Sequence, residues 1–395
     1  MNVTVQRVTD PIEGMHRSIS DRLLRLGGPE IQPLARAYQT MTGAIYESVR
    51  GMGWVVGSAL SLGATVAQRR GPVPFLWNAG PGSRVQAIAN GVWGDHFVGI
   101  DSPLSIEMAF RDRDGGSMDA ELVAIGSNFV RPGRRLAVLI HGLAETEAIW
   151  RNALVGDGED SGLAASLTVD GFTPLLLRYN TGCLISENGR ALAALLDRVT
   201  AAWPAPIDEI ALVGNSMGGL VARSALQEGR DRRLGWSTAV QRLVTVGSPH
   251  LGSPLEKLAA GASRALRFAP ETRPLSQFLE SRSEGIKDLH SGAINDDEAQ
   301  ADGFTEHFVS LQPSGVEQHF IAGVVTANVD HPVGKVVGDL IVRAASATGS
   351  GRVRSVEAKE SVVLGGRRHF DLAGDPDVIA QIREWLSPLP AADGF

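Results

Sequence analysis

The stretch from Glu209 to Gly229 constrains the fold of this chain more than any other. It begins with the apolar run EIALV, passes through the glycine-rich turn GNSMGG, and continues in the helical pattern LVARSALQEG. A strand, a sharp turn and a helix in this order place Ser216 over the carboxyl end of the strand. Gly214 and Gly218 stand two residues to either side of Ser216, where so tight a turn has no room for large side chains. The pattern makes Ser216 a candidate nucleophile at the edge of a sheet.

The alternation of buried strand and helix recurs through the middle of the chain. Five continuous apolar runs have the composition of strands buried on both faces, at 135–140, 173–177, 209–213, 242–246 and 319–325. Helical patterns lie between or after them, at 188–203, 217–229 and 376–386. Residues 105–111 and 118–125 add a β-hairpin across an Asp-Gly turn at 112–116. Together they predict an α/β domain with a mostly parallel sheet that helices cover on both faces.

The charge balance and the cysteine content exclude several classes of function. The 395 residues include 37 Lys and Arg against 44 Asp and Glu, a net charge of −7, which argues against a nucleic-acid binder. Cys183 is the single cysteine, so an intrachain disulfide and a cysteine-rich zinc site are both excluded. The histidines lack metal-ligand spacing such as His-Glu-x-x-His, and we expect neither a metal nor a cofactor.

Residues 1–80 differ from the rest and are predicted to be a helical extension with a linker at 71–81. Apolar residues recur at three- and four-residue steps through 34–68, and residues 51–68 carry no charge. Glycines and hydroxyl side chains in this uncharged run make a transmembrane helix the least favoured interpretation. A helix packed on the remainder of the chain or on a second copy, and a helix lying on a membrane surface, are the alternatives. The N-terminal sequence has no apolar signal segment, which favours a cytoplasmic location.

Residues 81–395 are predicted to form one domain that a long insertion interrupts. The rhythm of strands stops near Gly252 and resumes after Pro313, with helical pieces, polar turns and no strand between. Because an insertion of this size rarely stays structureless within a compact domain, we expect residues 252–313 to form a cap or lid.

The segment His141-Gly142-Leu143, which ends the apolar run 135–140, resembles the oxyanion-hole loop of lipases and esterases in the α/β-hydrolase superfamily. The resemblance implies that the backbone N–H groups of Leu143 and Met217 stabilise a tetrahedral oxyanion. It also implies that His141 orients the loop and is not the catalytic base, while Gly142 shapes the loop.

The remaining residues of a catalytic triad follow the order Ser, Asp, His in this superfamily. The base lies between the last strand and the closing helix, which is the position of His369 in RRHFDLAGDP. Asp339, in VGDLIVRAASA, resembles the Gly-Asp-(Gly)-Leu-Val-Pro-x-x-Ser-Ala signature around the acid of bacterial lipases. Here the second glycine is absent and Arg343 replaces the proline. Asp330 stands nearer the preceding strand and stays open as the alternative acid.

From about residue 84 to residue 386 the chain is similar to bacterial serine esterases and lipases of the inositol-deacylase-like branch. The similarity rests on LAVLIHGLAETEAIW, PLLLRYNTGCLISENGRALAALL, IALVGNSMGGLVARSA and VTVGSPHLGSPLEKL. Asn215 departs from the histidine usual before the nucleophile, and we do not expect this to remove activity. The resemblance implies an α/β-hydrolase fold and a triad of Ser216, Asp339 and His369 that works through an acyl-enzyme.

Three functions remain open at this point. The first is hydrolysis of short- to medium-chain carboxylic esters. The second is a lipase, phospholipase or acyltransferase that works on lipid at a membrane. The third is a catalytically silent hydrolase-fold scaffold that assembles through its N-terminal helices. Tyr179 and Asn180, just past a strand end, are candidates to line a substrate pocket, and equally candidates for a strand cap and turn.

Overall fold

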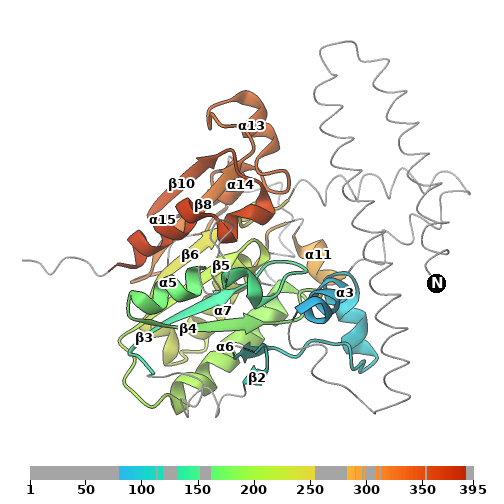
Figure 1. Ribbon diagram of the computed structural model, residues 1–395, viewed down its shortest axis with the longest axis vertical. Coiled ribbons are helices and arrows are strands. Elements are labelled where there is room, and N and C mark those ends of the chain that lie inside the picture. Colours follow the sequence, from blue (N-terminus) through green and yellow to red (C-terminus); the bar gives the residue numbers. More distant parts are fainter. Residues whose placement is uncertain are drawn as a thin grey trace, which may run out of the picture. The chain divides into compact units, whose positions relative to one another are not determined.

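The protein is described from a computed structural model (Figure 1). Contacts divide the chain into two compact units, residues 1–85 and residues 86–395. The structure describes ten segments, at 80–112, 114–118, 132–151, 162–253, 283–289, 291–295, 298, 308–310, 313–351 and 354–387. The helices predicted at 34–68, and most of the insertion predicted at 252–313, therefore lie outside the described residues.

Within the described residues, eight strands form one sheet in the order β10-β8-β6-β5-β3-β4-β1-β2. The six strands from β10 to β4 are parallel, and β1 and β2 form an antiparallel hairpin at the β4 edge. Their bounds are β1 Ala109–Arg111, β2 Ser117–Met118, β3 Arg135–Ile140, β4 Phe172–Arg178, β5 Glu209–Asn215, β6 Val240–Val246, β8 Glu317–Val324 and β10 Glu360–Gly365. The remaining strands, β7 Phe308–Ser310 and β9 Arg354–Val356, pair separately with each other.

Two hydrophobic layers cover the two faces of this sheet because successive side chains of a strand point to opposite faces. In β3, Leu136, Val138 and Ile140 pack on one side with buried residues of helices α6 (Ile185–Ala202) and α7 (Met217–Asp231). Ala137 and Leu139 pack on the other side with helices α5 (Leu163–Val169) and α15 (Pro376–Leu386). Figure 1 shows the strands between these helices. Strands buried on both faces explain the continuous apolar runs of the sequence.

The remaining helices are α3, which has 20 residues, and several helices of at most six residues. The 3-10 helices η3 and η5 follow β3 and β10, and the remaining helices precede the sheet or lie between its strands. Their bounds are α3 Gly80–Gly99, η3 Glu147–Trp150, α8 Trp236–Ala239, α11 Glu284–Asp288, α13 Pro332–Val337, α14 Ala344–Ala347 and η5 His369–Gly374.

The predicted elements are confirmed with small changes at their ends. The five predicted strands are β3, β4, β5, β6 and β8. Of the hairpin predicted at 105–111 and 118–125, the short pair β1 and β2 is present, and residues 119–125 lie outside the described segments. The expectation of no strand between 252 and 313 is wrong, because β7 lies there. Three residues are too short to show a period in the sequence, and β7 is identified only by its pairing with β9. The linker predicted to reach Pro81 also ends earlier, because α3 begins at Gly80.

The chain therefore has the α/β-hydrolase fold, a mostly parallel sheet between helices with an antiparallel hairpin at one edge. None of the helices in the described segments combines the length and the apolar content that a membrane crossing needs.

Candidate active site

Ser216 stands on a strained turn between β5 and α7. Its φ of 51° and ψ of −121° lie outside the regions that non-glycine residues ordinarily adopt, and its N–H donates to Val246 O at 2.7 Å. Only glycine fits at the positions two residues before and two residues after Ser216. A Cβ on Gly214 would lie 2.4 Å from Gly219 N, and a Cβ on Gly218 would lie 2.3 Å from Ile140 O. The close packing that the sequence predicts for these glycines is therefore present, and Ser216 is 7% exposed.

The structure brings Ser216, His369 and Asp339 together at the carboxyl edge of the sheet. His369 opens η5, and its Nε2 lies 2.9 Å from Ser216 Oγ. The other ring nitrogen, Nδ1, lies 2.7 Å from Asp339 Oδ2. An ionised carboxylate only accepts hydrogen bonds, so Nδ1 carries the proton and Nε2 is free to accept one from the hydroxyl. This is the arrangement of a nucleophile, a base and an orienting acid.

Asp339 is fixed on both sides of its carboxylate. While Oδ2 faces His369, Oδ1 accepts the backbone N–H of Ile341 at 3.0 Å and of Val342 at 2.8 Å. The carbonyl of Asp339 also accepts the N–H of His369 at 3.0 Å. The alternative acid, Asp330, is exposed and pairs with Lys335 at 3.0 Å. Of the two aspartates, only Asp339 contacts the histidine in the described structure.

Opposing effects set the pKa of His369. Burial of the ring disfavours the charged form and lowers the pKa, whereas the charge and hydrogen bond of Asp339 and the charge of Glu145 raise it. The net direction is upward from the ordinary histidine value. Because these carboxylates stabilise the imidazolium, they favour transfer of the Ser216 proton to His369.

The loop His141–Thr146, here called the oxyanion loop, lies against the nucleophile. A Cβ on Gly142 would be 3.0 Å from Ser216 Cβ, so the loop backbone passes directly beside the serine. The next N–H belongs to Leu143. Met217 begins α7, and N–H groups in the first turn of a helix have no acceptor within the helix. Both predicted oxyanion donors thus lie on backbone segments that flank Ser216, at the positive end of a helix dipole.

His141, the first residue of this loop, is held by contacts of its ring and its carbonyl. Its ring is buried and stacks on the Tyr179 ring with centroids 4.6 Å apart, and Tyr179 Oη donates to His141 O at 2.9 Å. Its Nδ1 lies 2.9 Å from Gly142 O, which can only accept, so Nδ1 carries the proton. Burial lowers the pKa of His141 to about 4. A neutral ring held in this way matches the orienting role that the resemblance implies.

The two candidates for lining a substrate pocket, Tyr179 and Asn180, are buried and form hydrogen bonds within the protein. Tyr179 is 1% exposed. The Asn180 amide donates from Nδ2 to Gly94 O at 2.9 Å and accepts the Gly182 N–H at 3.0 Å through Oδ1. Their predicted role in lining a substrate pocket stays a prediction.

The other histidines after Ser216 have structural positions or lie outside the described residues. His250 is buried with its Nε2 2.9 Å from Thr245 Oγ1, and His331 accepts the Val333 N–H at the start of α13. His319 stacks on Trp385, while positions 290 and 307 are outside the described segments. In the part of the chain that the structure describes, no three His, Cys, Asp or Glu side chains are grouped to hold a metal ion.

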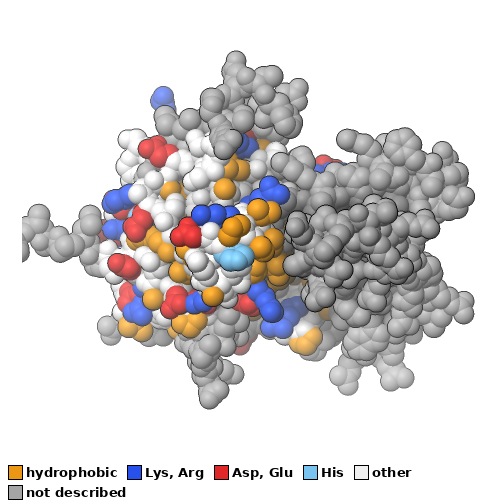
Figure 2. Space-filling model, turned by 90° about the horizontal axis from the view of Figure 1, so that it is seen from above, with side chains coloured by type: hydrophobic (Ala, Val, Ile, Leu, Met, Phe, Trp, Pro, Cys, Tyr) orange, Lys and Arg blue, Asp and Glu red, His pale blue; other side chains and the backbone are white. Residues whose placement is uncertain are grey.

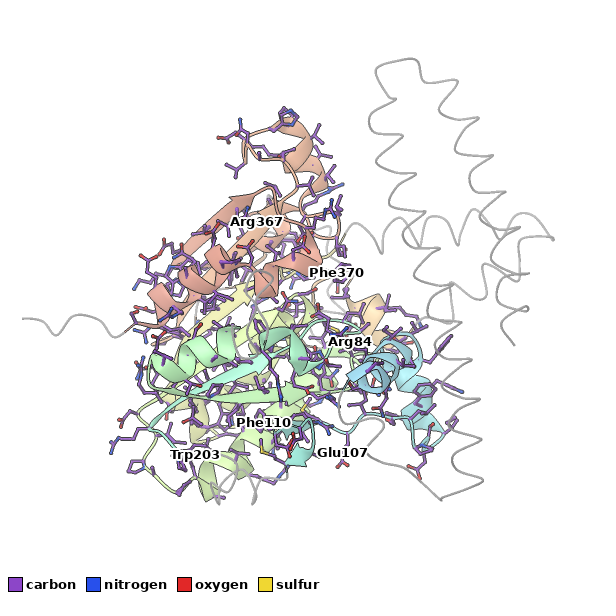
Figure 3. All side chains as sticks on the ribbon, viewed as in Figure 1. Arg84, Glu107, Phe110, Trp203, Arg367 and Phe370 are labelled. Carbon is purple, nitrogen blue, oxygen red and sulfur yellow. The ribbon has the colours of Figure 1, made fainter. Side chains whose placement is uncertain are left out.

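Two further residues near the site were not singled out from the sequence. Glu145 lies within the oxyanion loop, and its carboxylate accepts hydrogen bonds from Gly142 and Asn215. Phe370, which Figure 3 labels, is 69% exposed. Its ring meets the His369 ring edge-on with centroids 5.7 Å apart. Figure 2 shows exposed hydrophobic side chains gathered among charged ones on one face of the molecule. The sequence shows that Glu145 follows His141 by four residues. It gives no sign that Glu145 contacts Asn215, because the two are 70 residues apart.

Comparisons with known proteins give one family match over part of the chain and a set of similar solved structures. Residues 187–266, from α6 to beyond β6, match the family described as PGAP1-like alpha/beta domain. None of the curated proteins matches the chain. Solved structures similar to it include the mature lipase BlEst2 of Bacillus licheniformis, at 19% identity and a TM-score of 0.42 over 66% of this chain and 94% of that one. Lipase 1 of Pelosinus fermentans is similar at 13% identity and a TM-score of 0.39, over 65% of this chain and 100% of that one.

Proposed function

We propose that this α/β-hydrolase-fold chain is a serine hydrolase of carboxylic esters. One observation carries the proposal: Ser216 Oγ, His369 Nε2, His369 Nδ1 and Asp339 Oδ2 form a continuous chain with separations of 2.9 and 2.7 Å. The serine stands at the strained strand-to-helix turn that exposes a nucleophile at the sheet edge.

The geometry supports a two-step reaction through an acyl-enzyme. Ser216 Oγ attacks the acyl carbon of the ester while its proton moves to His369 Nε2. The carbonyl oxygen becomes an oxyanion, which the N–H groups of Leu143 and Met217 stabilise. As the tetrahedral intermediate collapses, the imidazolium gives its proton to the departing alkoxide, which leaves as the alcohol. Water then attacks the acyl-enzyme with His369 again as base, which releases the acid and restores Ser216.

We propose short- to medium-chain acyl esters as the substrates.

A second candidate function, a lipase, phospholipase or acyltransferase acting on lipid, is favoured by a specific observation. Four exposed hydrophobic side chains lie close in sequence to the acid and the base, namely Val333, Val336, Leu340 and Phe370. Leu340 and Phe370 directly follow Asp339 and His369, so an apolar rim next to the site is available to an acyl chain.

The test is hydrolysis of p-nitrophenyl esters from C2 to C16 by the wild type and by Ser216→Ala, with and without micelles. We expect hydrolysis by the wild type that falls to the background rate in the variant, with the highest kcat/KM at short to medium chains. A preference for C12 or longer together with activation by micelles would favour the lipid-directed function. Equal rates for the two proteins would overturn the enzyme proposal and favour the silent scaffold.

The N-terminal extension is a separate proposal. We propose that residues 34–68 either contact a membrane surface or join two copies of the chain. Liposome co-sedimentation and light scattering of the full chain and of a variant lacking residues 1–79 distinguish the two. Loss of liposome binding indicates the first, a change of mass per particle indicates the second, and no change in either would refute both.

A further inference from the structure

We propose that Glu145 is a positioning residue that ties the oxyanion loop to the nucleophile turn through one carboxylate oxygen. The inference rests on the proposed function and adds a residue to it. Glu145 lies three residues after Gly142 in the loop and 70 residues before Asn215, the neighbour of Ser216. It is thus in a position to set the distance between the two backbone segments that flank the reacting carbonyl.

Both bonds converge on the same atom. Glu145 Oε2 accepts the Gly142 N–H at 2.7 Å and the Asn215 Nδ2–H at 2.9 Å. There is no spare room in this arrangement, because a Cβ on Gly142 would lie 2.7 Å from that oxygen and 3.0 Å from Ser216 Cβ. Carboxylate, loop backbone and nucleophile are therefore in direct packing contact.

The Asn215 amide is oriented by this bond. Oε2 accepts from Nδ2, so the amide presents its nitrogen to Glu145 and turns Oδ1 away. Burial raises the pKa of Glu145, and the hydrogen bonds from Asn215 and Gly142 act against that rise. Oδ1 is buried, and no described residue donates to it. An unsatisfied buried carbonyl is unfavourable, and the hydrogen bond that Nδ2 donates to Glu145 offsets that cost. Asn215, which stands where a histidine is usual, thus has Glu145 as its hydrogen-bond acceptor.

The loop needs such a fastening because its backbone is strained. Ala144, between Leu143 and Glu145, has a φ of 59°, which is unfavourable for a residue other than glycine. Its N–H donates to Thr181 Oγ1 at 3.1 Å, and beyond the loop Glu147 forms a buried ion pair with Arg178 at 2.6 Å. These contacts fix the loop at Ala144 and just after its end. The hydrogen bonds of Glu145 fix the loop at Gly142, which lies beside Ser216.

A second effect of Glu145 is electrostatic. The charged groups acting on the His369 ring are Asp339, from the segment after α13, and Glu145, from the oxyanion loop, and both raise its pKa. Removing the negative charge of Glu145 therefore lowers the pKa of His369. Charge and hydrogen bonding can be separated, since glutamine keeps an acceptor oxygen but has no charge, whereas alanine has neither.

The experiment compares kcat, KM and the pH profile of kcat/KM for the wild type, Glu145→Gln, Glu145→Ala and Asn215→Ala on a short p-nitrophenyl ester. Glu187→Ala is the matched control, because Glu187 also accepts the backbone N–H of the residue three positions before it, Leu184, at 3.3 Å, but is exposed at the start of α6. A 1 Å misplacement of reacting groups costs about 10²-fold. We expect kcat to fall by about 10- to 100-fold in Glu145→Ala with KM within about 2-fold.

Glu145→Gln should retain most of kcat, Asn215→Ala should show a smaller loss than Glu145→Ala, and the control should equal the wild type. The acidic limb of kcat/KM should move to lower pH in both Glu145 variants. A wild-type kcat in Glu145→Ala, or an equal loss in Glu145→Gln without the pH shift, would overturn the proposal. If Glu145→Ala fails to fold by circular dichroism, Asn215→Ala decides through its kcat. A wild type no faster than Ser216→Ala would instead overturn the proposed function.

Discussion

At the scale of single residues, the backbone fixes the acid of the candidate site, and the acid in turn fixes the base. Asp339 directs Oδ2 at His369 while Oδ1 accepts two N–H groups, and the His369 N–H returns to the carbonyl of Asp339. Each reacting group is therefore fixed before a substrate binds. Such preorganisation is what gives charged groups their catalytic effect.

Replacing Asp339 by asparagine tests this arrangement. The amide can donate a hydrogen bond to Nδ1, which would leave His369 in the wrong tautomer to accept the Ser216 proton. We expect kcat to fall by about 10³- to 10⁴-fold, measured on the same ester, with little change in thermal stability. Asp330→Asn is the control and should be fully active, because Asp330 is exposed and pairs only with Lys335. Full activity of Asp339→Asn would transfer the acid role to another residue.

The pH dependence of the reaction follows from the raised pKa of His369. Only the neutral ring can accept the proton of Ser216, so activity is present above this pKa and is lost as the pH falls through it. We expect the acidic midpoint of kcat/KM to lie above the ordinary histidine value of about 6.5. A midpoint below that value would mean that burial outweighs Asp339 and Glu145.

At the scale of elements, the turn between β5 and α7 determines where the chemistry can occur. A Cβ on Gly218 would lie 2.3 Å from Ile140 O and 2.6 Å from His141 O, both backbone atoms of the strand and loop beneath it. α7 can approach β3 this closely only because its first turn has no side chain there. The helix dipole and the oxyanion loop meet at Ser216 for this reason.

Gly218→Ala should therefore lower both stability and activity. Backbone oxygens cannot move away as a flexible side chain would, so we expect a loss of about 1–3 kcal/mol in unfolding free energy by denaturant titration, together with reduced kcat. Gly235→Ala is the matched control. A Cβ there meets nothing within 4 Å, and its φ of −57° suits alanine. Equal stability of the two variants would contradict the packing described here.

Patterns that are local in sequence were predictable, and contacts between distant segments were not. The runs that became β3, β4, β5, β6 and β8 are buried on both faces and so are apolar without interruption. β10 escaped prediction because it is an edge strand with partly exposed side chains. The positions of Ser216, His369 and Asp339 followed from flanking motifs, whereas the Glu145–Asn215 contact joins residues 70 apart and has no motif.

At the scale of the whole sheet, the two edges have different tasks. The candidate site lies at the carboxyl edge, while the amino edge has a cluster in which Glu209 pairs with Arg135 and Arg242. Glu209 begins β5 and Ser216 directly follows its last residue, so the two stand about 23 Å apart at the usual strand rise of about 3.3 Å per residue. Stability and activity should thus be separable by mutation.

Glu209→Ala tests this separation. It would remove the close partner of the buried Arg242, which then has Glu317 at 3.9 Å, and breaking a buried pair costs up to about 3–5 kcal/mol. We expect a lower melting temperature with kcat within about 2-fold of the wild type below that temperature. Asp208, which precedes Glu209, pairs with Arg134 on the surface, so Asp208→Ala should leave the melting temperature unchanged. A large loss of kcat in folded Glu209→Ala would show that the two edges are coupled.

The central claim is that Ser216 is a nucleophile activated by His369 and Asp339, and covalent labelling measures this most directly. The protein is incubated with a fluorophosphonate, and intact mass and peptide mass spectrometry give the number and the place of adducts. We predict one adduct per chain on the peptide that contains Ser216, none in Ser216→Ala, and much slower labelling in Asp339→Asn. An unlabelled wild type, or labelling of Ser216→Ala at the wild-type rate, would contradict the account.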